Sequence, residues 1–72
     1  MHTSTLNLAD LRRALDLKDP LTATRIRGAL LARLYPGFNP LALPQVTVDI
    51  TSRGVKITCE FSNRDLKKRI GL

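Results

Sequence analysis

The chain has 72 residues, of which one is cysteine and one is histidine, so an intramolecular disulfide and a Cys/His zinc site are excluded. It carries twelve Lys or Arg residues and six Asp or Glu residues, for a net charge of +6. Neither a signal peptide nor a membrane-spanning run is recognisable, which predicts a cytoplasmic protein with a single domain, residues 1–72, ordered from about residue 6 to 70.

A first helix is predicted from Leu8 to about Asp16. Asn7 precedes it and is a capping residue type. The apolar residues of this segment recur at helical spacing, which places Arg12 and Arg13 away from the buried stripe. Both arginines are therefore predicted to face solvent.

A second helix is predicted from Leu21 to Leu34. Asp19-Pro20 supplies a cap and a proline at the first helical position, and Tyr35-Pro36-Gly37 ends the helix. Arg25 and Arg33 fall on one row, on either side of a small alanine. Two guanidinium groups spaced in this way on a helix are suited to contacts with phosphates or guanine edges.

The proline-rich connection from Phe38 to Pro44 contains three large apolar residues, Phe38, Leu41 and Leu43. Two interpretations stay open at this stage. These residues either cover an open end of the core or form an exposed apolar patch that binds a partner protein.

Alternating apolar residues predict a β-hairpin from Val46 to Phe61. With Arg53-Gly54 as a two-residue tip, the apolar pairs would be Val46/Phe61, Val48/Cys59 and Ile50/Ile57. The other face would carry the pairs Thr47/Glu60, Asp49/Thr58 and Thr51/Lys56. This face lacks aromatic residues, so it is unsuited to stacking the bases of single-stranded nucleic acid.

Ser62 and Asp65 resemble a capping box, and Gly71 ends the helix that follows. The element order is then α-α-β-β-α. The sequence thus predicts a compact α+β domain in which a two-stranded antiparallel hairpin packs on helices.

Catalytic chemistry has no sequence support. His2 lies near the chain end, Cys59 is predicted to face the core, and neither a glycine-rich phosphate loop nor a carboxylate pair is present. We therefore expect no enzyme activity, no metal and no cofactor. The basic balance instead favours polyanions or acidic protein surfaces as partners. The candidate nucleic-acid contacts are Arg12, Arg13, Arg25, Arg33, Arg53 and Lys56.

Four segments in this order resemble small winged-helix regulators of the excisionase/MerR-like type. They are LNLADLRRAL, DPLTATRIRGALLARL, VTVDITSRGVKITCEF as the wing, and SNRDLKKRI as the closing element. The resemblance implies a winged-helix DNA-binding protein that regulates transcription. In such a protein Arg25 and Arg33 would read duplex DNA, and Arg53 would be the residue of the wing that contacts DNA. A homodimer is compatible with this interpretation.

A helix ending in Tyr-Pro, followed by two strands and a short helix, also resembles the latter part of DinI-like proteins, which modulate a recombinase by protein contact. The alternative hypothesis is accordingly a small phage- or plasmid-type protein that inhibits or modulates a host protein. It would use Phe38, Leu41 and Leu43 together with the basic flanks. A third possibility is a structural subunit whose apolar loop is buried against a neighbouring chain.

Overall fold

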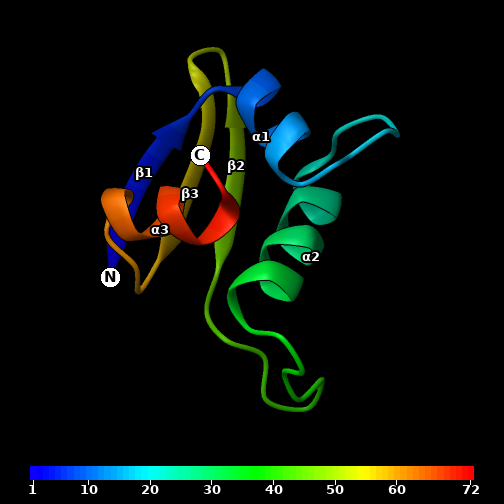
Figure 1. Cartoon of the computed structure of the whole chain (residues 1–72), viewed down its shortest axis with the longest axis vertical. Helices are drawn as coiled ribbons and strands as arrows, with labels where there is room; N and C mark the ends of the chain where they lie inside the picture. Colours follow the sequence, from blue (N-terminus) through cyan, green and yellow to red (C-terminus); the bar gives the residue numbers. More distant parts are fainter.

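A computed structural model describes residues 1–72 and shows an α+β fold (Figure 1). Its elements, in chain order, are the strand His2–Leu6 (β1), the helices Leu8–Ala14 (α1) and Ala23–Leu34 (α2), the strands Thr47–Thr51 (β2) and Gly54–Cys59 (β3), and the helix Asn63–Ile70 (α3). The strands form one antiparallel sheet in the order β1-β3-β2. The helices lie on one side of this sheet, and its other face is open (Figure 1).

The strand β1 was not predicted from the sequence. The element order is β-α-α-β-β-α rather than α-α-β-β-α, and regular structure begins at His2 rather than near residue 6. β1 pairs along its whole length with β3, from His2 opposite Cys59 to Leu6 opposite Val55. Only Ser4 and Leu6 of β1 are buried, so the segment lacks the apolar alternation by which a strand is recognised.

The hairpin has its apolar residues on the expected face, but its predicted register is wrong by two residues. Ile50 pairs with Val55 and Val48 with Ile57, so the tip is Ser52-Arg53 rather than Arg53-Gly54. A slip of two residues keeps each side chain on its face, so the alternation alone could not distinguish the two registers.

The turn is fixed by polar contacts at the hairpin tip. The Thr51 hydroxyl accepts a hydrogen bond from the backbone N–H of Arg53 (3.2 Å) and donates one to the carbonyl of Gly54 (3.0 Å). Gly54 has a φ of 137°, which L side chains rarely adopt. These contacts close the strands at the pair Thr51/Gly54.

The predicted start of the first helix, Leu8, and the predicted end of the second, Leu34, are confirmed, but the other bound of each helix needs correction. α1 ends at Ala14, since Asp16 adopts the left-handed conformation with a φ of 51°. α2 begins at Ala23, and its cap is Thr22, whose hydroxyl accepts a hydrogen bond from the backbone N–H of Arg25 (3.2 Å). Asp19 is not a cap. The third helix has its predicted ends, with Ser62 as cap and Gly71 left-handed at a φ of 88°.

The core contains 13 buried hydrophobic residues drawn from both the sheet and the helices: Leu6, Leu11, Leu15, Ile26, Leu30, Leu31, Leu34, Val46, Val55, Ile57, Cys59, Leu66 and Ile70. Cys59 is fully buried, which confirms its predicted placement in the core. The guanidinium Nε of Arg27 donates to the carbonyl of Val46 (2.8 Å) and ties α2 to the start of the hairpin. None of the helices combines the length and the apolar composition needed to cross a bilayer.

Candidate functional site

Two of the predicted nucleic-acid contacts, Arg12 and Arg33, are bonded to backbone carbonyls at the end of α1 and in the α1–α2 connection. Arg12 donates from Nε to Leu17 (3.3 Å) and from Nη2 to Lys18 (3.5 Å). Arg33 donates from Nη2 to Ala14 at the end of α1 (3.1 Å). Helix ends leave carbonyls without partners, and the Arg33 guanidinium satisfies one of them, whereas Arg12 holds the backbone of the connection. Both side chains therefore stabilise the fold in this conformation.

Arg13 and Arg25 are held in exposed ion pairs. Arg13 lies 2.6 Å from Asp10, and Arg25 lies 2.9 Å from Asp19. Exposed pairs of this kind contribute roughly 0 to 1 kcal/mol, so a phosphate could replace either aspartate at little cost. Each pair nevertheless cancels the local charge that would attract a polyanion.

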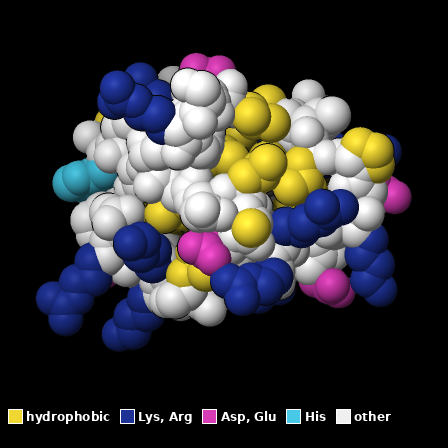
Figure 2. Space-filling view, turned by 90° about the horizontal axis from the view of Figure 1, so that it is seen from above, with side chains coloured by type: hydrophobic (Ala, Val, Ile, Leu, Met, Phe, Trp, Pro, Cys, Tyr) yellow, Lys and Arg dark blue, Asp and Glu magenta, His cyan; other side chains and the backbone are white.

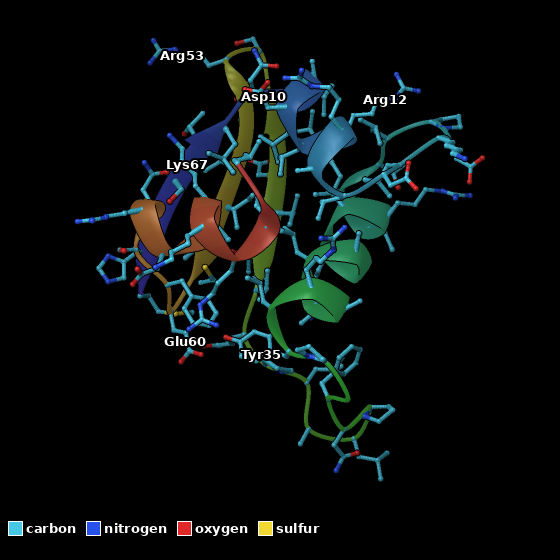
Figure 3. The ribbon with its side chains drawn as sticks, viewed as in Figure 1. Asp10, Arg12, Tyr35, Arg53, Glu60 and Lys67 are labelled. Atoms are coloured by element: carbon cyan, nitrogen blue, oxygen red, sulfur yellow. The ribbon has the colours of Figure 1, made fainter.

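Arg53 and Lys56 differ from the other four candidates because their side chains bond to neither a carboxylate nor a backbone carbonyl. Arg53 stands at the hairpin tip and extends away from the body of the molecule (Figure 3). Lys56 lies three residues after Arg53 on β3, opposite Thr5 of β1 and Asp49 of β2. Although Asp49 is directly opposite, it forms no ion pair with Lys56.

These two cations line one pocket with three hydroxyl side chains. The pocket has a volume of about 370 Å³, and its lining residues are Thr5, Thr51, Ser52, Arg53 and Lys56. None of them is acidic or apolar. The pocket therefore offers positive charge and hydroxyl groups without a competing carboxylate in its lining.

Sequence reasoning identified Arg53 and Lys56 but missed Thr5, Thr51 and Ser52 as members of this site. Thr51 and Ser52 adjoin the tip, so a site built around Arg53 could have included them. Thr5 is separated from Lys56 by 51 positions in the chain, and only the pairing of β1 with β3 brings them together. That pairing had no sequence signal.

Further basic residues lie on α3. Leu66 and Ile70 of this helix are buried, whereas Arg64, Lys67 and Lys68 are exposed. Figure 2 looks onto the end of the molecule that carries the hairpin tip, and Lys and Arg side chains project from both its left and right sides. Acidic side chains appear singly between them. Positive charge is thus spread around the molecule, but the pocket at the tip is where basic residues line a concave surface that has no acidic lining residue.

The exposed row of α2 consists of residues with small side chains. Thr24, Gly28 and Ala32 are exposed at a spacing of four residues, and a Cβ at Gly28 would meet no atom within 4 Å. A large ligand could therefore approach the backbone of α2 closely. Arg25 and Arg33, predicted as its reading side chains, are engaged with Asp19 and Ala14 in this conformation.

The apolar connection divides into a buried part and an exposed part. Phe38 is partly buried and packs against the core. Leu41 is 95% exposed and Leu43 is 46% exposed. Only the two leucines could therefore form the apolar patch of the alternative hypothesis.

The chain matches no protein-family model, no curated protein and no solved structure. No group of three or more His, Cys, Asp and Glu side chains could hold a metal ion.

Proposed function

We propose that this protein is a small cytoplasmic DNA-binding protein with a regulatory or accessory role, and that the hairpin tip contacts the backbone of duplex DNA. The proposal rests on one observation. Arg53 and Lys56 are the predicted contacts whose side chains bond to neither a carboxylate nor a backbone carbonyl, and they border a pocket that is lined only by polar residues. Phosphate oxygens are the groups that such cations and hydroxyls bind in protein–DNA complexes.

Arg25 supplies a second contact in this proposal. Its guanidinium is bonded only to the exposed Asp19 carboxylate, which a phosphate can replace. The small exposed row of Thr24, Gly28 and Ala32 lets α2 approach the duplex. Arg12 and Arg33 keep their carbonyl partners and act by supporting α1 and α2.

Salt dependence tests the proposal. Binding of a fluorescent duplex is measured by anisotropy between about 50 and 200 mM salt, and each phosphate contact contributes about −0.9 to the slope of log K against log[salt]. Arg53→Gln and Lys56→Gln should each weaken binding at about 50 mM salt and reduce this slope by about 0.9.

Arg13→Gln is the matched control, because it removes one positive charge that Asp10 already neutralises. It should change the affinity much less than Arg53→Gln. Absence of binding to any duplex at about 50 mM salt contradicts the proposal, as do equal effects of the three substitutions.

The exposure of Leu41 and Leu43 favours a second candidate, a protein that binds and modulates a host protein through this loop. Leu41→Asp is the discriminating variant. Leu41 makes little packing contact at 95% exposure, so the variant should remain folded. Loss of a nuclease-resistant partner in a pull-down supports this candidate, whereas unchanged capture excludes the loop as the interface.

A further inference from the structure

We infer that the pocket at the hairpin tip is a specific binding site for a single phosphate group, held by Arg53, Lys56 and the hydroxyls of Thr5 and Ser52. The identification of that phosphate as one of duplex DNA rests on the proposed function. The site itself does not, because a free phosphorylated molecule presents the same oxygens.

The side chains in the pocket have the chemistry of a phosphate site. Lys56 provides a compact ammonium charge with three donors, and Arg53 provides a planar group that can bind two oxygens at once. Hydroxyl groups add neutral donors, and the Thr5 and Ser52 hydroxyls have no partner within the protein. Two cations and two hydroxyls complement a dianion, whereas an apolar ligand would find no apolar lining residue here.

The pocket is also held in place by the backbone around it. The antiparallel pairing of β1 and β3 sets Thr5 directly opposite Lys56, so these two side chains stand on the same open face of the sheet. On the other side, the Thr51 hydroxyl is used within the turn, where it fixes the backbone N–H of Arg53 and the carbonyl of Gly54. Thr51 is therefore a positioning residue, not a contact.

The close approach of β1 to the turn also helps to hold the pocket in a fixed arrangement. An added Cβ at Gly54 would lie 2.5 Å from the carbonyl oxygen of Leu6, so the end of β1 is pressed against the first residue of β3. This contact keeps Thr5 beside the tip. The pocket walls thus come from β1, the turn and β3 in a fixed arrangement, which lowers the entropic cost of binding an ion.

No other basic part of the molecule combines cations, free hydroxyl groups and a pocket without acidic lining residues. The second pocket, of about 360 Å³, is lined by Asp16 and Asp19 as well as Lys18 and Arg25, so its charges cancel. The lysines of α3 are exposed on a convex helix and line no pocket. Specific phosphate binding should therefore be confined to the tip.

Inorganic phosphate is the probe for the test. The ¹⁵N-labelled protein is titrated with phosphate against chloride at equal ionic strength, and amide shifts are followed by NMR. Phosphate should shift the amides of Thr5, Ser52, Arg53 and Lys56 in a saturable manner and leave Lys67 and Lys68 nearly unchanged. Lys56→Gln should raise the phosphate Kd about tenfold, as expected for loss of a charge-assisted hydrogen bond.

Lys67→Gln is the matched control, because it removes the same charge from an exposed helix position outside the pocket. It should change the Kd less than about twofold if long-range attraction alone is lost. Equal effects of the two substitutions, or unsaturable shifts of similar size at the tip and on α3, overturn the site.

A second titration with a short duplex separates the site from the proposed function. If phosphate saturates the pocket but no duplex binds, the site stands with a free phosphorylated ligand, and the DNA-binding proposal fails. If the duplex binds while the amides of the pocket do not move and phosphate does not saturate them, the site fails and DNA binding stands. If both phosphate and the duplex shift the same four amides, the phosphate site and the DNA-binding proposal are both supported.

Discussion

Tyr35 joins three parts of the fold at the end of the molecule opposite the hairpin tip. Its hydroxyl donates to Oε1 of Glu60 (2.6 Å), and the two side chains meet at the end of α2 and the end of β3 (Figure 3). Its ring lies 5.6 Å from the ring of Phe61, over which the guanidinium of Arg69 is placed at 4.2 Å. The pKa of Tyr35 is raised to about 12, chiefly by partial burial and in addition by the hydrogen bond to the Glu60 carboxylate and its negative charge.

Tyr35→Phe should lower the free energy of unfolding by about 1 kcal/mol near neutral pH, the usual net value of a hydrogen bond that water can reach. The raised pKa also predicts a pH dependence. An ordinary tyrosine has a pKa of about 10, so folding favours the protonated hydroxyl. Its stabilising contribution should be complete below pH 10 and should be lost as the pH rises to about 12.

Urea unfolding from pH 8 to 12 measures this effect in the native protein and in the variant. Tyr35 is the sole tyrosine in the chain, so the difference between the two pH profiles isolates its hydroxyl from the lysines and from Cys59. Parallel profiles would show that the contact with Glu60 contributes nothing to stability.

At the level of the secondary-structure elements, the residues that carry apolar periodicity were predictable. The alternation in β2 and β3 and the capping residues Ser62 and Asn7 gave the hairpin and the starts of two helices. The start of α2 was misplaced because Asp19 and Thr22 are both capping residue types, and local sequence does not rank them. β1 was missed because most of its side chains face solvent.

Gly54→Ala should strongly destabilise the sheet. The substitution places a Cβ 2.5 Å from the carbonyl oxygen of Leu6, and it also forces a φ of 137° on a residue with a side chain. The unfavourable backbone conformation alone costs roughly 1 to 2 kcal/mol, and the displacement of β1 adds to this cost. We expect the variant to lose at least about 2 kcal/mol of stability and, with Thr5 displaced, its phosphate affinity.

Gly28→Ala is the control for this prediction. Gly28 lies in α2 with no atom within 4 Å of an added Cβ, so alanine should stabilise the helix by about 0.5 to 1 kcal/mol. Thermal melts followed by circular dichroism compare both variants with the native chain. A native melting temperature for Gly54→Ala would mean that β1 does not approach the turn as closely as described.

At the scale of the whole molecule, net charge led to the prediction of a polyanionic partner but did not indicate where on the molecule such a partner would bind. Six basic residues were candidates, and local sequence gave no means of separating them. The structure engages Arg12 and Arg33 with carbonyls and Arg13 and Arg25 with carboxylates. The pair Arg13/Asp10 lies within α1, whereas the partners of Arg12, Arg25 and Arg33 depend on how α1, its connection and α2 are arranged. These contacts together distinguish Arg53 and Lys56 from the other four candidates.

The stability of the whole domain should depend on β1. A 72-residue protein has a free energy of unfolding of roughly 4 to 11 kcal/mol, at about 0.05 to 0.15 kcal/mol per residue. Removal of residues 1–6 deletes the buried Leu6 side chain and exposes the edge of β3, which β1 otherwise pairs along five positions. Loss of a buried leucine alone costs about 2 to 5 kcal/mol, before the ladder is counted.

We therefore expect the chain without residues 1–6 to lose cooperative unfolding, because this loss approaches the total stability available to so small a core. Leu6→Ala, which keeps the strand but removes its buried side chain, should remain folded with a lower melting temperature. Thermal melts and amide dispersion in NMR spectra distinguish the two. A truncated chain with a sharp, near-native melt would show that the helices and the hairpin suffice, and that β1 serves only to bring Thr5 to the pocket.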